Sequence, residues 1–196
     1  ILINSLLYLL LARNDLNELK SAIREGKRGL DLMEEHSKAC ALYPRFVHSY
    51  IRAVEESRVE KVDLVPRDGW QQQLFQDLSE IPNNRSIIWI YDADGNKGKS
   101  YFARNYPGRN YYVTGGKAAD IYYGYEYEPV VFFDLARMKQ DIVQYDVMEA
   151  FKNGQFYSTK YESRLVRFNI PHVVVFANFH PATQMLSADR WDIRVI

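Results

Sequence analysis

The sequence predicts an α/β protein, with a mainly parallel sheet in its second half and a small helical domain before it. Two observations support this. From residue 86 onward, short apolar runs that suit buried strands alternate with segments that suit helices. Between the first run and the helix after it lies a stretch of small and polar residues. It ends in Gly98-Lys99-Ser100, as expected of a phosphate-binding loop.

Five apolar runs are predicted as the strands of one sheet. They cover residues 87–91, 111–114, 130–134, 172–177 and 193–196. Helices are predicted at residues 99–106 and 141–151. Because strands and helices alternate, we expect most strands to be parallel.

Residues 1–78 are predicted to form a separate helical domain with its linker, and residues 79–196 the α/β domain. The apolar spacing within residues 16–23 fits one helix face, and Gly26 ends that helix. Further helices are expected at residues 30–33, 46–54 and 70–81, with a linker at 64–69.

The composition excludes several classes of protein. Lys+Arg and Asp+Glu both number 25, so the formal net charge is zero and any nucleic-acid site must be a local patch. Cys40 is the single cysteine, which excludes an internal disulfide. The apolar run 1–12 is too short to span a bilayer and follows no basic stretch, so we expect no membrane segment and no signal peptide. Because the chain starts at Ile1 rather than Met, we expect a fragment of a longer protein.

A phosphate loop needs backbone N–H groups, a lysine for the β- and γ-phosphates and a hydroxyl for Mg²⁺. Gly98, Lys99 and Ser100 fit these roles, and the helix that follows adds a partial positive charge. The loop departs from the usual pattern at Ala93, where glycine is expected, and Gly95 is the residue that could supply the flexibility. The predicted nucleotide contacts are Gly95, Asn96, Lys97, Gly98, Lys99, Ser100 and Tyr101.

Two further strands end in polar residues. Asp134 follows an apolar run, and a carboxylate at that edge of an α/β sheet can hold Mg²⁺ together with Ser100. Asn178 ends another run and could position the attacking water. Either residue could instead be a turn former. Leu135 follows Asp134, so the second acid that many ATPases use is missing.

In combination these motifs resemble the superfamily 3 helicases, and specifically the replication initiators (Rep) of circular single-stranded DNA viruses, satellites and related plasmids. The resemblance covers about residues 86–196. Gly98–Ser100 looks like the family's Walker A motif, Phe133–Arg137 like Walker B, Gly154–Tyr161 like the B′ loop, Val175–Asn178 like motif C and Leu186–Trp191 like the segment that closes the ATPase core.

The resemblance implies an AAA+-like P-loop ATPase that uses ATP and Mg²⁺ and unwinds DNA. Lys99, Asp134 and Asn178 would be catalytic, with an arginine finger acting on a neighbouring subunit. Arg190 is the candidate finger, although a salt bridge to Asp189 or Asp192 is an equal alternative; Arg137 is a second candidate. A finger in trans implies a homo-oligomer, and the family implies a hexameric ring with the helical segment as its collar.

The family also implies binding of single-stranded DNA at the B′ loop. Lys160 is the leading contact, with Tyr161 beside it and Lys117 as a weaker candidate. Without the resemblance, a solvated hairpin would be the preferred interpretation. Tyr157 has the spacing of a DNA-nicking tyrosine, but no His-x-His motif accompanies it, so we assign it to the loop. A nuclease domain upstream, and a location in the host cell and in its nucleus if the host is a eukaryote, are expected.

Two other classes of function remain open from the residues. One is a different P-loop enzyme such as a small kinase, which would need an acceptor pocket and a lid. The other is a nucleotide-degenerate assembly module, which Ala93 and the missing second acid would favour.

Overall fold

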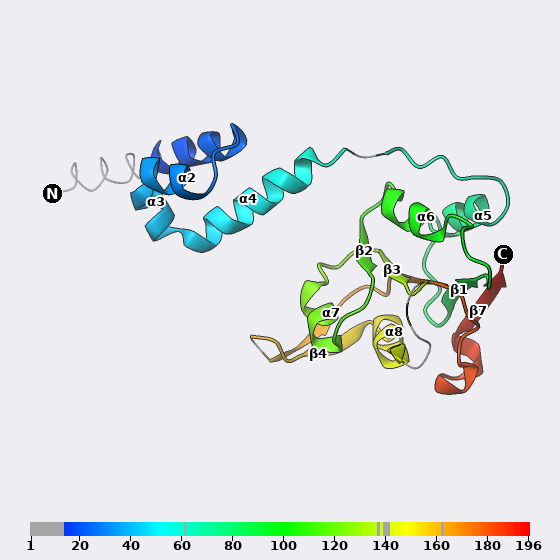
Figure 1. Cartoon of the computed structure of the whole chain (residues 1–196). Coiled ribbons are helices and arrows are strands. Elements are labelled where there is room, and N and C mark those ends of the chain that lie inside the picture. Colours follow the sequence, from blue (N-terminus) through cyan, green and yellow to red (C-terminus); the bar gives the residue numbers. More distant parts are fainter. Residues whose placement is uncertain (1–13, 61, 137, 139–141, 162) are drawn as a thin grey trace. The chain divides into compact units, whose positions relative to one another are not determined.

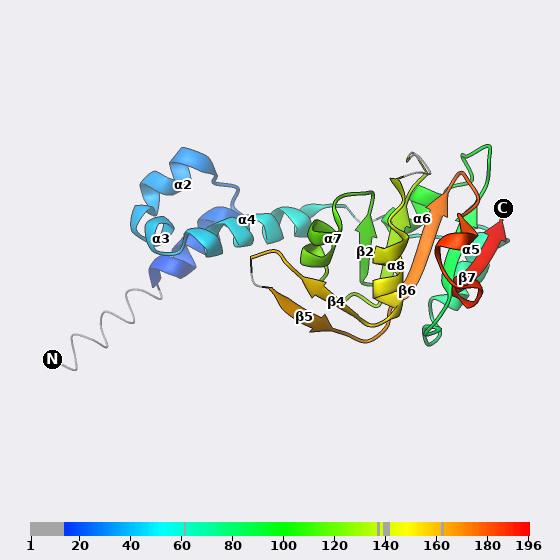
Figure 2. The ribbon, with the colours of Figure 1, turned by 90° about the horizontal axis from the view of Figure 1, so that it is seen from below.

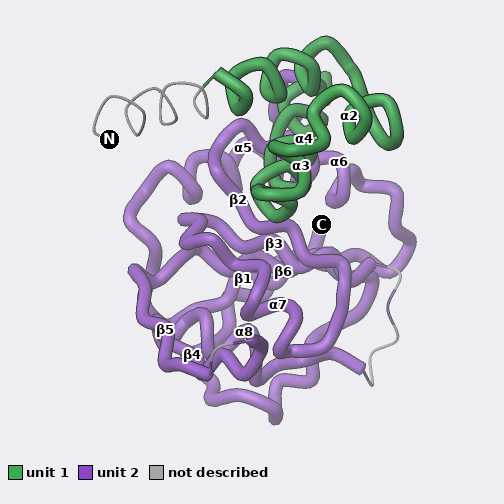
Figure 3. Tube along the Cα trace, turned by 90° about the vertical axis from the view of Figure 1, so that its left-hand side faces the viewer, with its two compact units in different colours: residues 1–61 green, residues 62–196 purple. Residues whose placement is uncertain are grey.

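The computed structural model (Figure 1) describes residues 14–60, 62–136, 138, 142–161 and 163–196. The chain divides into two compact units, residues 1–61 and residues 62–196 (Figure 3). This division falls before the boundary at 78/79 that the sequence suggested, because Leu74 and Leu78 are buried in the core of the second unit.

The first unit consists of short helices around a small apolar core. Residues 14–24 are helical, and Gly26, with φ 102°, follows the end of that helix. The remaining helices are α2 (Gly29–Glu35), α3 (Ser37–Leu42) and α4 (Pro44–Arg58), with proline in the first turn of α4. The buried core residues are Leu19, Ala22, Ile23, Leu32 and Ala39. The sequence did not predict α3, whose six residues show no clear apolar period.

The second unit contains a five-stranded sheet in the order β2-β3-β6-β1-β7, in which all pairs are parallel. β2, β6 and β7 point in the same direction in Figure 2. The strands are β1 (Ile87–Tyr91), β2 (Asn110–Val113), β3 (Val130–Asp134), β6 (His172–Ala177) and β7 (Trp191–Val195). This confirms the predicted fold class.

Apolar side chains cover both faces of this sheet. On one face, Trp89, Phe133 and Val175 share a core with α7 (Ala118–Gly124) and α8 (Tyr145–Lys152). On the other, alternating residues such as Phe132 and Phe176 share a core with α5 (Trp70–Asp77) and α6 (Lys99–Asn105). A strand buried on both faces reads as a continuous apolar run, which is why β1, β3 and β6 were predicted with their observed bounds.

A two-stranded hairpin projects from this core. β4 (Gln155–Ser158) pairs antiparallel with β5 (Arg164–Arg167). Phe156 is buried and stacks on Tyr122 of α7, with ring centroids 4.3 Å apart. The hairpin is therefore attached to α7 through an aromatic contact. None of the described helices has the length and apolar character needed to cross a bilayer.

Candidate functional site

The carboxyl ends of the central strands carry two polar residues that the sequence singled out, Asp134 and Asn178. Tyr91, at the end of β1, pairs with Ala177, so the loop after β1 and Asn178 leave the sheet side by side. Asp134, at the end of β3, pairs with Phe176. Ligands of open α/β sheets bind at this edge. The strand order therefore brings Asp134 and Asn178 to the edge from which the loop to Lys99 departs.

The loop between β1 and α6 turns through residues with positive φ. Gly95, Asn96 and Gly98 have φ of 75°, 62° and 83°. Gly98 is the N-cap of α6, where a Cβ would lie 2.9 Å from the Gln71 amide nitrogen. The positive φ favours glycine at this position, and a side chain there would also displace the Gln71 amide. The first turn of α6 presents Lys99, Ser100 and Tyr101 directly after it.

Lys99 is held by a carboxylate that sequence reasoning missed. Its ammonium donates to Asp92, and both side chains are only 4% exposed. Asp92 also accepts a hydrogen bond from the Gly95 N–H. Burial alone would raise the pKa of Asp92, but the hydrogen bonds from Lys99 and Gly95 outweigh it and hold that pKa below its ordinary value. The pair ties the start of α6 and the loop to the end of β1.

Asp134 is oriented by two donors. The Tyr112 hydroxyl of β2 donates to its Oδ2 at 2.5 Å, and the Ala136 N–H donates to its Oδ1 at 3.3 Å. Burial, together with the hydrogen bond to Asp134, raises the pKa of Tyr112. The tyrosine therefore remains protonated and donates to the Asp134 carboxylate.

The residues at this edge fit Mg²⁺ bound with a nucleotide, although not a cation held by protein alone. No group of three or more His, Cys, Asp or Glu side chains that could hold a metal occurs among the described residues. Mg²⁺ commonly uses one or two carboxylates and completes its shell with waters and substrate phosphates. The Asp134 carboxylate and the Ser100 hydroxyl are oxygen donors of the right kind.

Asn178 lies beside the phosphate loop with an unpaired acceptor. Its Oδ1 is buried and has no hydrogen-bond partner in the described part of the chain. Its Nδ2 lies 3.4 Å from the point that a Cβ on Gly95 would occupy. An unpaired acceptor at this position is available to a water or a hydroxyl.

Arg190 is not brought to this edge. It precedes β7, whose first residue pairs with the first residue of β1, and so lies at the opposite end of the sheet. Its side chain is 3% exposed, and its guanidinium contacts Asn153, the Arg85 carbonyl and Glu149. An arginine that acts on a neighbouring subunit must reach the surface, so this burial favours a structural role. These partners of Arg190 are not Asp189 or Asp192, the salt-bridge partners that the sequence suggested. The second candidate finger, Arg137, lies outside the described residues.

The tip of the β4–β5 hairpin meets α7 through charge and aromatic contacts. Lys160 forms an ion pair with Asp120, and its ammonium lies 5.4 Å from the Tyr123 ring centroid and 6.0 Å from that of Tyr161. The two tyrosine rings are 5.0 Å apart, and Tyr161 is 82% exposed. Lys117 is exposed at the start of the same helix. The three predicted DNA contacts, Lys160, Tyr161 and Lys117, therefore lie at the hairpin tip and at the start of α7. Asp120 and Tyr123 of α7 contact Lys160.

Lys152 does not belong to this surface, although it adds to the positive charge of the segment that contains the hairpin. It is buried, and its ammonium donates to the backbone carbonyls of Asn83 and Pro171. Burial, with a smaller contribution from the positive charge of Arg190, lowers the pKa of Lys152 to about 8. Its charge therefore stabilises no bound DNA.

This lowered pKa predicts an alkaline rise in stability. Between about pH 8 and 9 the unfolded chain holds the Lys152 proton and the folded chain increasingly does not, so the free energy of unfolding should increase with pH. At higher pH the buried tyrosines act in the opposite direction, because burial raises their pKa and the unfolded chain loses those protons first. The slope is at most about 1.4 kcal/mol per pH unit. Urea unfolding at several pH values should show it, and Lys152→Met should abolish it while the exposed Lys117→Met leaves it unchanged. An unchanged slope in Lys152→Met would contradict this assignment.

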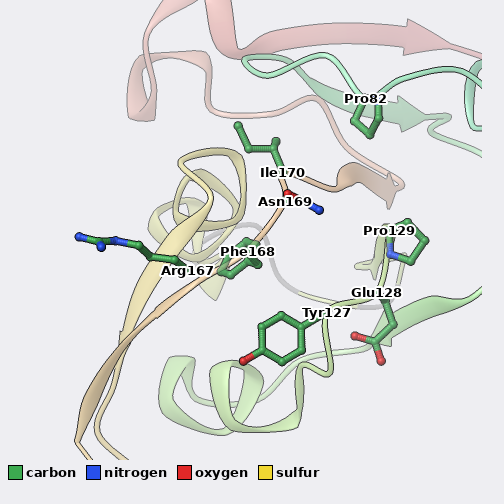
Figure 4. A pocket seen from close by; sticks show the side chains of 8 residues that line it. All are labelled: Pro82, Tyr127, Glu128, Pro129, Arg167, Phe168, Asn169 and Ile170. Carbon is green, nitrogen blue, oxygen red and sulfur yellow. The ribbon is translucent and has the colours of Figure 1, made fainter.

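A cavity of about 700 Å³ lies away from all the predicted site residues (Figure 4). Pro129 precedes β3 and Ile170 lies shortly before β6, which places the cavity at the amino end of the sheet. Its two charged lining residues, Glu128 and Arg167, point away from each other in Figure 4. Nothing in this lining resembles a nucleotide site.

Together, the parallel sheet, the glycine-bounded loop, the buried lysine and the carboxylate on β3 define a P-loop nucleotide-binding domain. Residues 88–179 match the model of the RNA helicase family. This match covers the segment that holds the phosphate loop, Asp134 and Asn178, and it supports the resemblance seen in the motifs.

The chain is also similar to replication proteins. It is 33% identical over 186 residues to the "Master replication protein" of Subterranean clover stunt virus (strain F), covering 91% of this chain and 62% of that protein. It is 37% identical over 144 residues to "Para-Rep C2" of the Milk vetch dwarf C2 alphasatellite, covering 71% and 51%. The chain thus spans between half and two thirds of these relatives. Among solved structures it matches NtrX from Brucella abortus in complex with ADP, with 14% identity, a TM-score of 0.32 and coverage of 76% and 40%, a likeness that supports no functional argument.

Proposed function

We propose that residues 62–196 are the ATP-hydrolysing motor of a DNA helicase that serves a replication initiator. One observation carries this proposal. The strand order brings the phosphate loop with Lys99, the carboxylate of Asp134 and the amide of Asn178 to one edge of a single sheet. The similarity to replication proteins supports DNA as the nucleic acid.

The residues at this edge have complementary tasks in ATP hydrolysis. Lys99 exchanges Asp92 for the β- and γ-phosphates, while the loop N–H groups contact the phosphate oxygens. Ser100 and Asp134 would hold Mg²⁺, which neutralises developing charge on the phosphates when it is bound. Asn178 orients the attacking water through its unpaired Oδ1. Catalysis then consists mainly of positioning and charge stabilisation.

The remaining parts of the proposal concern assembly and context. Single-stranded DNA binds at Lys160, Tyr161 and Lys117, and the motor works as a homo-oligomeric ring, with six subunits as the expected number. The helices of residues 1–61 form its collar. A nuclease domain precedes this chain in the whole protein, which acts in the host nucleus where the host is a eukaryote.

ATP hydrolysis with and without single-stranded DNA tests the proposed function. We expect Mg²⁺-dependent turnover that DNA stimulates in the chain at concentrations where it assembles. Turnover that required a small-molecule acceptor instead would favour a kinase. Nucleotide binding without turnover at any DNA concentration would favour the assembly module.

The hairpin tip should respond to charge changes in opposite directions. Lys160→Ala should weaken binding to an oligothymidine about 3- to 10-fold, because it removes one phosphate contact and the cation between two exposed rings. Asp120→Asn should strengthen binding, because it frees Lys160 from its carboxylate partner. Fluorescence anisotropy of a labelled oligonucleotide measures both.

Asp146→Asn is the matched control for the change in net charge. Asp146 is exposed on α8 and has the same charge, without the ion pair to Lys160. If Asp120→Asn and Asp146→Asn raised the affinity equally, the effect would belong to net charge, and the role given to the Lys160–Asp120 pair would be wrong.

A further inference from the structure

A buried amide beside the phosphate loop has an unused donor. Gln71, the second residue of α5, is 1% exposed. Its Oε1 accepts a hydrogen bond from the Arg67 N–H at 3.0 Å, whereas its Nε2 has no partner within the described part of the chain. Because the Arg67 N–H can only donate, this hydrogen bond fixes which end of the amide is oxygen. The unpaired end is therefore an NH₂ group that needs an acceptor.

This donor lies against the phosphate loop. A Cβ on Gly98 would stand 2.9 Å from the amide nitrogen and 3.9 Å from Nη1 of Arg67. Trp70, next to the amide in sequence, packs on Phe102 of α6 and Phe176 of β6, with ring centroids 5.8 and 5.9 Å apart. The core thus holds the start of α5 beside the residue that begins the phosphate-binding helix.

We propose that Gln71 and Arg67 form the base-binding side of the nucleotide site. This inference rests on the proposed function, in which the loop binds a nucleoside triphosphate. Gln71 donates to a ring nitrogen or carbonyl oxygen of the base, and the exposed guanidinium of Arg67 covers its face. A glutamine amide is well matched to a base edge, because both offer neutral, directional hydrogen-bonding groups.

The base is favoured over the phosphates as the acceptor for two reasons. The phosphates already have a cation in Lys99 and the loop N–H groups, and the loop end near Gly95 faces Asn178 and Asp92. Gln71 approaches the other end of the loop, at Gly98, from a segment that precedes β1 and contributes none of those groups. In the proposed site, the base of the nucleotide extends from the phosphates towards Gln71.

A comparison of two ligands that differ only in the base tests this assignment. Dissociation constants for ATP and for ribose 5′-triphosphate are measured by calorimetry on the whole chain. Gln71→Met removes the unpaired donor together with the acceptor for the Arg67 N–H, and it adds no charge beside the phosphate loop. Gln72→Met changes the exposed neighbour on the same helix and serves as control. Because each variant is compared with itself on two ligands, a general loss of stability changes both alike.

We expect Gln71→Met to bind ATP about 3- to 10-fold more weakly and ribose 5′-triphosphate with unchanged affinity. Equal losses for the two ligands, or no loss for either, would overturn the assignment of Gln71 while leaving the proposed function in place. If the unmodified chain bound neither ligand, or bound them independently of Lys99, the proposed function and the inference would fail together.

Discussion

Lys99→Ala should reduce ATP turnover by at least about 100-fold, because one preorganised cation is removed from the place where phosphate charge develops. The same change leaves Asp92 buried without its partner. Breaking such a pair costs about 3–5 kcal/mol of stability. Turnover is measured by phosphate release, and the folded fraction by circular dichroism during urea unfolding.

A second variant separates lost chemistry from lost folding. Lys99→Met combined with Asp92→Asn replaces the buried charges with groups of similar size, so stability should return towards that of the unmodified chain. Turnover should stay absent in this folded double variant. Recovery of hydrolysis in the double variant would show that Lys99 acts only through the fold, and the catalytic role given to it here would be wrong.

Trp89→Ala should lower the free energy of unfolding by about 3–5 kcal/mol, the usual cost of removing a fully buried large aromatic residue. Trp89 is 0% exposed in β1 and packs against Tyr145, with ring centroids 6.0 Å apart. Its indole N–H also donates to the Phe179 carbonyl at 3.0 Å. Equilibrium unfolding in urea measures the loss.

Trp89→Phe gives the matched comparison. It keeps most of the apolar volume and removes the hydrogen bond to Phe179, the residue that follows Asn178. We expect a smaller loss of stability together with slower ATP hydrolysis, because the segment that carries Asn178 loses its attachment to β1. Full activity in Trp89→Phe would show that the indole serves the core alone.

The sheet was the most predictable part of the fold. β1, β3 and β6 are buried on both faces, and a continuous apolar run of five or six residues leaves few alternatives once a loop follows it. α7 was not predicted, because it has seven residues, follows Gly115-Gly116 and contains one fully buried side chain, Ile121. Such a helix depends on packing against the hairpin rather than on its own periodicity.

The candidate site was predictable where chemistry follows from position in a strand or loop. Lys99, Asp134 and Asn178 stand at the ends of recognisable elements. Asp92 and Gln71 were missed because their roles depend on three-dimensional contacts, Asp92 with the lysine that begins α6 and Gln71 with a loop that follows a later strand. The local sequence around Gln71 gives no sign that its side chain is buried.

Arg190, by contrast, was singled out in the sequence and lies buried away from the candidate site. An arginine between two aspartates at the end of the domain suggests an exposed charge, and both interpretations drawn from the sequence assumed one. Its burial follows from tertiary packing, since Asn153 at the end of α8 and the Arg85 carbonyl meet at the start of β7. No local pattern indicates that these segments converge.

Under the proposed function, the ion pair between Lys160 and Asp120 would also change how DNA binding responds to ionic strength. A lysine that neutralises a DNA phosphate normally releases a condensed counterion, which steepens the salt dependence of binding. Here a phosphate would displace a carboxylate, and the freed Asp120 would attract cations from solution in turn. This attraction would offset part of the counterion release at this contact. The hairpin tip would therefore hold single strands with an affinity buffered against salt, and Asp120→Asn would restore up to about 0.7 to the slope of log affinity against log salt.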